Sequence, residues 1–191
     1  MSETEKSAPV AKKSFKERLH LFFHPEGVRL EMLRYRPNSV SYGFTFLGCG
    51  AMAASFCLIY SGTVISKSKT FSLFGITSLG FWAAFDVLLN IVLLLFLFLA
   101  ASQMKTYSRK WGIFALCVAV FECIRPFLYP LALRQADILN SGLFVAVVIL
   151  QIGSGVCFLI AGLISIYRGQ TLQAYLKTVK PIENEKIEAG K

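Results

Sequence analysis

The chain contains four long runs of apolar residues separated by short polar segments. These runs cover residues 42–65, 74–101, 111–133 and 141–167. A helix of about 20 apolar residues is long enough to cross the hydrocarbon core of a bilayer, and each run reaches that length. The pattern therefore predicts an all-α integral membrane protein, with a four-helix bundle of four spans within residues 38–169 and short loops between them.

A different pattern precedes the first run. Residues 1–13 are polar and are predicted to form a disordered tail. Ser14 and Glu17 have the spacing of a capping box, which predicts a helix start. Within residues 14–37, apolar and basic positions fall on different sides of a helix, which is typical of an amphipathic helix in the membrane interface. The residues predicted to meet the membrane surface are Phe15, Lys16, Arg18, Phe22, Phe23, Arg29, Arg34 and Arg36.

The fourth run is followed by a charged segment, residues 170–191, which we expect to form a cytoplasmic tail. The last helix can extend past the membrane through Tyr175. Pro181 lacks the backbone N–H that a helix interior needs, so we expect the helix to end there and the rest to be disordered.

The third run carries an acid, a base and two prolines: Glu122, Arg125, Pro126 and Pro130. A charge at the centre of a bilayer costs about 3 kcal/mol or more, so such side chains usually face protein or water. Each proline removes one helical hydrogen bond, which predicts a kink and leaves two carbonyls in need of new partners.

The second run contributes Asp86 and Asn90, which are four residues apart and share one face of a helix. With a rise of about 1.5 Å per residue, Asn90 and Arg125 lie about 20 Å from the same membrane boundary. Arg125 can then reach Asp86, Asn90 or, on its own helix, Glu122. With Gln151, the one large polar residue of the fourth run, these side chains form the predicted intramembrane polar cluster.

Two interpretations of this cluster stay open. The three charges sum to minus one, so either one carboxyl is protonated or another group completes the balance. In the first interpretation an ion pair fixes the packing of two helices, and the extra acid is neutral or hydrated. In the second, a buried carboxyl without a full partner carries protons, as in many transporters.

Small residues recur at helical spacing in two runs. Gly50 and Ala54 are four apart, and Gly155, Gly162 and Gly169 are each seven apart. Both spacings let helix backbones approach closely, so we expect these residues to pack helices together. The first run also matches G-x-G-x-x-A from residue 48, but a membrane-length apolar run offers no preceding strand, so a dinucleotide cofactor is rejected.

Composition and charge agree with a membrane protein. The chain has 191 residues, of which 55% are hydrophobic and 16% charged, whereas soluble domains carry about 25% charged residues. The net charge is +9, but the basic residues flank the apolar runs, so the expected counter-charge is lipid headgroups and not nucleic acid. Sixteen Lys and Arg flank one side of the predicted spans and three flank the other, which places both termini in the cytoplasm.

Candidate catalytic and metal chemistry is sparse. His20 and His24 are four apart with Glu17 nearby, but Leu21 breaks the H-E-x-x-H motif, and a structural zinc site needs four ligands. The five cysteines lie in apolar runs without a C-x-x-C pair. No Ser-His-Asp set or P-loop appears. We therefore expect no enzyme activity, no metal and no cofactor.

The leading hypothesis is an accessory or scaffolding subunit that binds another membrane protein or a second copy of itself. The alternative is a pathway for protons, small ions or solutes built around Asp86, Asn90, Glu122 and Arg125. The inverted repeat found in many transporters is absent from the sequence.

Overall fold

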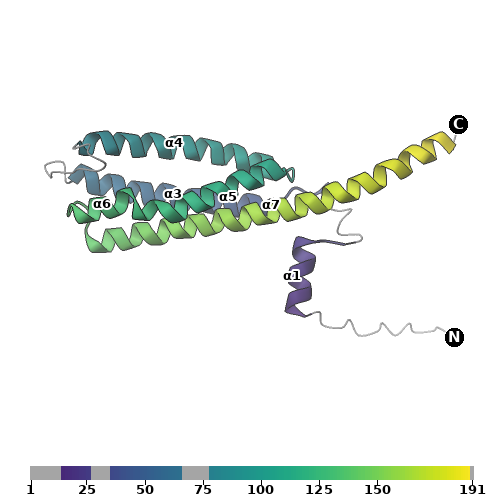
Figure 1. Cartoon of the computed structure of the whole chain (residues 1–191), viewed down its shortest axis with the longest axis horizontal. Helices are drawn as coiled ribbons and strands as arrows, with labels where there is room; N and C mark the ends of the chain where they lie inside the picture. Colours follow the sequence, from purple (N-terminus) through teal and green to yellow (C-terminus); the bar gives the residue numbers. More distant parts are fainter. Residues whose placement is uncertain (1–13, 27–34, 66–77, 190–191) are drawn as a thin grey trace, which may run out of the picture.

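A computed structural model describes residues 14–26, 35–65 and 78–189, and in these residues it contains helices and no strand (Figure 1). Four helical segments are long and apolar enough to cross a membrane: Ser39–Val64, Leu79–Met104, Arg109–Gln135 and Ser141–Val179. The predicted all-α, four-span membrane fold is therefore confirmed, and the chain is a multi-pass membrane protein.

Seven helical elements make up the described chain. They are α1 (Phe15–Phe23), α3 (Ser39–Ile65), α4 (Leu79–Met104), α5 (Arg109–Ile124), the 3-10 turn η1 (Arg125–Phe127), α6 (Tyr129–Gln135) and α7 (Ser141–Ala189). The predicted positions Arg29 and Arg34, the first connecting loop, residues 74–77 and the tail of residues 1–13 lie outside the described residues.

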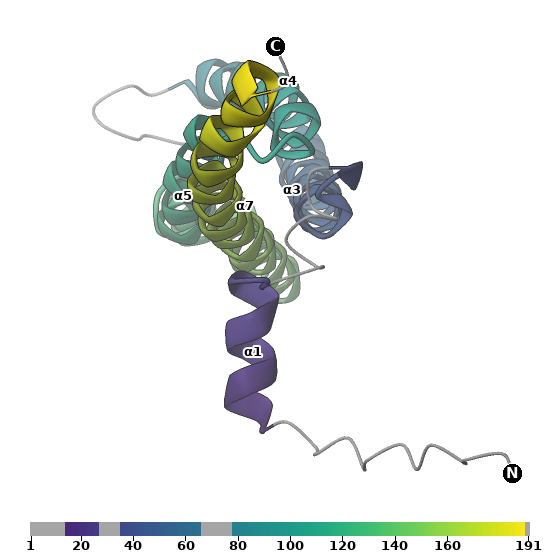
Figure 2. The same cartoon turned by 90° about the vertical axis from the view of Figure 1, so that its right-hand side faces the viewer.

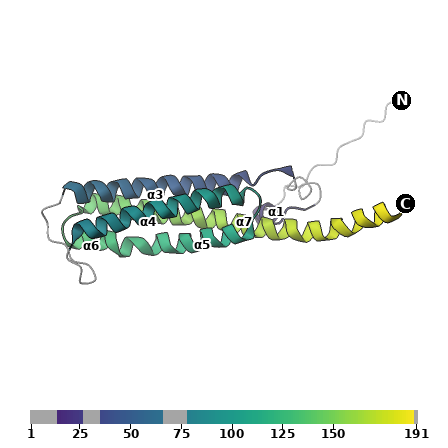
Figure 3. The same cartoon turned by 90° about the horizontal axis from the view of Figure 1, so that it is seen from above.

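The four spans run side by side, with α5, η1 and α6 together forming the third (Figures 1 and 3). Helix α7 packs mainly against α3 and α5, and α4 also packs against α3 and α5. The spans therefore form a ring in the order α3, α7, α5, α4. Helix α1 and the C-terminal part of α7 lie at the same end of this bundle, and α1 runs across its long axis (Figure 2).

The third span is interrupted where its prolines lie. Helix α5 ends at Ile124, η1 carries Pro126, and Leu128 has the non-helical dihedrals φ −97° and ψ −105°. Pro130 lies in the first turn of α6, where a proline costs no hydrogen bond. The sequence predicts a kink here, and the structure has a short break with a 3-10 turn.

The last helix is longer than the sequence predicts. Helix α7 continues to Ala189, so the expectation that Pro181 ends it is wrong. A proline removes one backbone hydrogen bond and bends a helix, but flanking turns made of good helix formers can continue beyond it. Figure 1 shows this part of α7 extending beyond the bundle.

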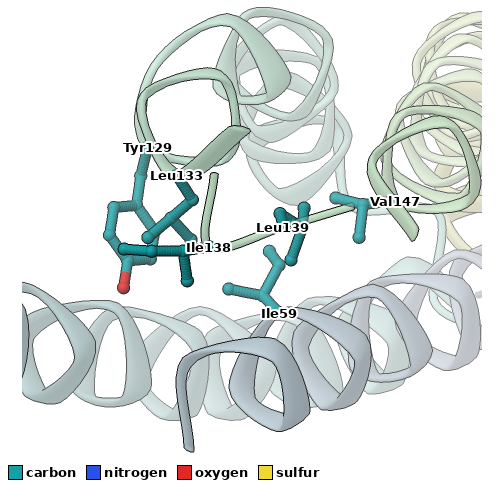
Figure 4. Close-up of a cluster of buried hydrophobic side chains, with 6 residues drawn as sticks. All are labelled: Ile59, Tyr129, Leu133, Ile138, Leu139 and Val147. Carbon is teal, nitrogen blue, oxygen red and sulfur yellow. The ribbon is translucent and has the colours of Figure 1, made fainter. Parts of the chain in front are cut away.

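Two of the three clusters of buried apolar side chains form layers across the bundle. One lies at the end away from α1 and is drawn in Figure 4; it joins Ile59 of α3, Tyr129 and Leu133 of α6, Ile138 and Leu139 of the following loop, and Val147 of α7. The other lies nearer the middle and contains Cys49, Met52, Leu97, Val118, Ala119 and Phe158. Along α4, α7 and the third span, the polar side chains described next lie between these two layers.

Candidate functional site: a buried polar layer

A layer of buried polar side chains separates the two apolar layers. Asp86 and Asn90 reach it from α4, Glu122 from α5, Arg125 from η1 and Gln151 from α7. Their exposed fractions are 6%, 1%, 0%, 3% and 0%. The sequence-predicted polar residues are therefore all enclosed by protein and do not face lipid.

Arg125 joins the second and third spans. Its Nη2 lies 2.6 Å from Asp86 Oδ1, which is a short charge-assisted contact. Its Nη1 donates to Asn90 Oδ1 at 3.0 Å and to Glu122 Oε1 at 3.2 Å. The 3-10 turn after Ile124 gives Arg125 its position, because the chain leaves the α-helical path there. One guanidinium thus contacts all three partners that the sequence left as alternatives.

Asn90 contacts both members of the ion pair between Asp86 and Arg125. Its side-chain amide donates to the backbone carbonyl of Asp86 at 2.7 Å and lies 3.2 Å from Asp86 Oδ2. Because Asn90 also accepts from Arg125, it links acid and base in one network. Networks of this kind are worth most when every member has a partner.

Two members of the layer have unused hydrogen-bonding atoms. Among the described residues, Glu122 Oε2 and both side-chain amide atoms of Gln151 have no hydrogen-bond partner. Glu122 and Gln151 come from α5 and α7, which pack against each other. An unsatisfied buried polar group costs about 1–3 kcal/mol, so these atoms mark the least satisfied part of the bundle.

A groove of about 360 Å³ opens between α3 and α4 at the end away from α1. Tyr60, Thr63 and Ala83 line it, and the same residues line a narrower space that reaches Asp86. That narrower space is too small for a water molecule. The polar layer is therefore closed toward this groove.

The predicted packing glycines of α7 all lie against the third span or the loop before it. A Cβ added at Gly155 would lie 2.7 Å from Cys123 Sγ, and one at Gly162 would lie 2.8 Å from the carbonyl oxygen of Gly112. At Gly169 it would lie 2.6 Å from the carbonyl oxygen of Tyr107. These contacts leave no space for a side chain, so the seven-residue repeat does mark the edge where α7 meets α5.

The other predicted packing pair is placed differently. Gly50 and Ala54 are exposed on the outside of α3, and a Cβ added at Gly50 would have no described heavy atom within 4 Å. They therefore make no close helix contact within the described bundle, and their role in helix packing stays a prediction. Gly48 lies in the core instead, where an added Cβ would lie 2.6 Å from Phe158. Spacing defines a helix face, but it does not say whether that face points inward.

Sequence reasoning missed two serine contacts between α3 and α7. Ser41 Oγ donates to the carbonyl oxygen of Ala161 at 2.7 Å, and Ser154 Oγ donates to that of Gly48 at 3.0 Å. Interhelical hydrogen bonds from serine are common between membrane helices. The available signal was the presence of serine within apolar runs, which alone does not identify a partner.

The loop between α4 and α5 closes the bundle near α1. Tyr107 has a left-handed φ of 57°, is buried, and donates from its hydroxyl to the carbonyl oxygen of Arg36 at 3.3 Å. Burial raises the pKa of Tyr107, and the charge of Arg168 partly offsets this effect. The phenol therefore stays protonated as a donor and ties the residues before α3 to the loop.

Helix α1 lies where the sequence predicts an amphipathic surface helix, and one side of it contacts α7. The Ser14 backbone N–H donates to Glu17 Oε2 at 3.0 Å, as expected at a capped start. Phe15, Lys16, Arg18 and Phe22 are exposed, while Phe23 is half-buried. Arg36, beyond α1, is also exposed. Contact of these residues with a membrane surface stays a prediction.

The histidines and cysteines form no cluster typical of a metal site. His20 and His24 have ring centroids 5.2 Å apart, and Glu17 is engaged at the helix start. In the part of the chain that the structure describes, no three His, Cys, Asp or Glu side chains gather where a metal ion could bind.

No protein-family model, curated protein or solved structure matches this chain.

Proposed function

We propose that this multi-pass membrane protein acts through membrane partners, as an accessory or scaffolding subunit without catalysis of its own. The observation that carries the proposal is the outward face of α3. Exposed residues there are spaced alternately four and three apart: Gly43, Leu47, Gly50, Ala54, Cys57 and Ser61. All but one are small, and such a face lets a second membrane helix approach closely. The partner is a membrane helix of another protein or of a second copy.

The polar layer supports a structural role for the charges. Arg125 is engaged by Asp86, Asn90 and Glu122 within one chain. The space leading from the groove toward Asp86 is too narrow for water. A buried ion pair of this kind fixes which helices meet and in what register. It accounts for intramembrane charges without a transported species.

A second candidate is a pathway for protons or small ions. It is favoured by the unpaired Glu122 Oε2 and Gln151 amide, which face a layer whose formal charges sum to minus one. A carboxyl oxygen with no partner is a natural place for a proton to bind and leave. The groove between α3 and α4 would then be one end of the route.

The placement in the membrane is part of the proposal. The excess of basic residues on one side of the spans supports a cytoplasmic position for both termini. Helix α1 crosses the long axis of the bundle, which is the direction of a helix lying in the membrane plane (Figures 1 and 2).

The partner-binding role is tested with two matched substitutions on lipid-exposed positions. Ala54→Leu adds bulk to the small-residue face of α3, and Ala84→Leu adds the same bulk to an exposed position of α4. We expect the wild-type chain, extracted from its native membrane in mild detergent, to migrate as a complex larger than its own 21.2 kDa. Ala54→Leu should reduce that complex and Ala84→Leu should leave it intact. A monomer in all three samples would contradict the proposal.

The transport alternative is tested in proteoliposomes with an internal pH dye. An accessory subunit should give no proton flux above that of empty vesicles. A flux that is present in the wild type and lost in Glu122→Gln would favour the second candidate instead.

A further inference from the structure

A groove lies between α1 and α7 at the end of the bundle that carries both described chain ends. Its volume is about 510 Å³, within the range of about 300–1,000 Å³ typical of small-molecule sites. Four of its lining residues are apolar or aromatic: Leu19 and Phe23 of α1, and Leu163 and Tyr167 of α7. The other lining residues are Lys16 and His20 of α1 and His24, which caps the end of α1.

The basic residues form one row. Lys16, His20 and His24 are each four residues apart, so they share one side of α1. No described acidic residue lines the groove, and Glu17 is turned to the helix start, where it accepts from the Ser14 backbone N–H. The groove is therefore lined by apolar side chains from both helices and, on the α1 side only, by a row of hydrogen-bond donors.

Direct contacts hold the two helices that form this groove. Arg168 Nε donates to the carbonyl oxygen of Phe22 at 3.0 Å, and its guanidinium carbon lies 4.3 Å from the centre of the Phe22 ring. The Phe23 and Tyr167 rings meet edge to face at 5.7 Å. His24 Nδ1 lies 3.3 Å from Thr171 Oγ1. Because both helices are fixed, the groove has a defined shape.

Its position matches the boundary between acyl chains and headgroups. The apolar part of α7 ends near Tyr167, and tyrosine is enriched at membrane interfaces. Helix α1 lies at this end of the bundle, where its Phe23 ring contacts Tyr167, and it runs in a direction across the bundle's long axis (Figure 1). Acyl chains then lie on the side of Leu163, and headgroups lie on the side of the basic row.

We propose that the groove binds one anionic phospholipid of the surrounding bilayer. An acyl chain lies against Leu19, Phe23, Leu163 and Tyr167, and the headgroup phosphate contacts Lys16 and His20. The charge and the apolar surface of the groove match the two ends of such a lipid. This site does not depend on the partner-binding role proposed above.

The first test measures affinity with the full-length protein in detergent. Native mass spectrometry with added phosphatidylglycerol or phosphatidylcholine counts the lipids that stay bound. We expect one phosphatidylglycerol to bind more tightly than phosphatidylcholine. Lys16→Gln should weaken this binding about fivefold, the usual worth of one basic residue near anionic lipid. Lys110→Gln removes a charge that is also exposed, at the start of α5, and should change the binding by less than about twofold, because Lys110 lies outside the groove.

The second test locates the lipid. Phosphatidylglycerol with a photoreactive group on its acyl chain should label the peptides that contain Leu19 and Leu163. Excess unlabelled phosphatidylglycerol should suppress this labelling, and phosphatidylcholine should not. Equal weakening by Lys16→Gln and Lys110→Gln would show diffuse surface charge and overturn the proposal. Labelling spread evenly over the lipid-facing helices would also overturn it.

Discussion

Arg125 holds the polar layer together because its guanidinium contacts a side chain on α4 at one nitrogen and a side chain on α5 at the other. Without it, Asp86 and Glu122 would be two buried carboxyls with no positive partner. Removing one member of a buried ion pair is costly because the remaining charge stays desolvated.

We predict that Arg125→Leu lowers the free energy of unfolding by about 3–5 kcal/mol. Adding Asp86→Asn should recover most of the loss, and Glu122→Gln should recover less. The reason is that Arg125 lies closer to Asp86, at 2.6 Å, than to Glu122, at 3.2 Å. Thermal unfolding of the single and double variants in lipid nanodiscs measures this difference.

Arg109→Leu is the matched control, because Arg109 is exposed at the start of α5. If Arg125→Leu is no more destabilising than Arg109→Leu, and neither acid couples to Arg125, then Arg125 does not organise the bundle.

Gln151 gives a separate residue-scale prediction. Its side-chain amide is fully buried and has no hydrogen-bond partner among the described residues. In a layer without water, this amide lowers the free energy of unfolding. Gln151→Leu should then leave the free energy of unfolding unchanged or raise it by about 1–2 kcal/mol. Destabilisation in the same thermal assay would instead indicate that water or Glu122 binds the amide, as a proton pathway requires. Gln103→Leu, at an exposed position of α4, is the control.

The polar layer was largely predictable at the residue scale. Charge is so costly in a bilayer that Asp86, Glu122 and Arg125 had to face inward, and helical rise placed them at similar depth. That Arg125 contacts all three of its candidate partners at once was not predictable, because this depends on the 3-10 turn. That Gln151 is left unpaired follows from packing, which no local pattern contains.

At the scale of elements, α7 packs against both α3 and α5, and glycine sets its distance from α5. Gly112 and Gly162 face each other, and a Cβ added at either would lie within about 3 Å of the other's carbonyl oxygen, at 3.1 and 2.8 Å. Close backbone approach of this kind supplies dispersion contacts where lipid removes the hydrophobic driving force between helices.

We predict that Gly162→Ala lowers the free energy of unfolding by about 1–3 kcal/mol, because the methyl group forces α5 and α7 apart. Gly153→Ala is the matched control on the same helix, since an added Cβ there meets no described heavy atom within 4 Å. It should be neutral or stabilise by up to about 1 kcal/mol through helix propensity. Equal effects of the two variants on thermal stability in nanodiscs would refute close packing at Gly162.

The number and position of the spans were predictable, because they depend only on the length of each apolar run. The direction in which a helix face points was not predictable, because it depends on long-range contacts. The four spans follow from run length. The outward direction of Gly50 and Ala54 does not, because a helix with small residues on two sides can use either side for its own bundle. The continuation of α7 beyond Pro181 was also not predicted from the position of the proline, since a proline can bend a helix without ending it.

At the scale of the whole molecule, an even number of spans returns the chain to the side from which it started. This matches the position of α1 and the end of α7 at one end of the bundle (Figure 3). The packing of the four spans does not determine which end of the bundle faces the cytoplasm. The cytoplasmic side is set by the basic residues that flank the spans, because segments rich in Lys and Arg tend to stay in the cytoplasm. A four-helix architecture also does not carry function, so the role of the molecule depends on its faces and its polar layer.

The last prediction concerns orientation. Sixteen Lys and Arg flank the side that holds both termini, and three flank the other. A reporter fused after Lys191 should therefore be cytoplasmic, and the same reporter inserted within residues 66–72 should lie on the opposite side. Replacing Lys105, Arg109 and Lys110 together with Gln should weaken this bias without inverting it, because the N-terminal segment keeps its eight basic residues. Equal accessibility of the two reporters would contradict the four-span topology, whereas opposite sides in the reverse sense would keep the bundle and overturn only the charge argument.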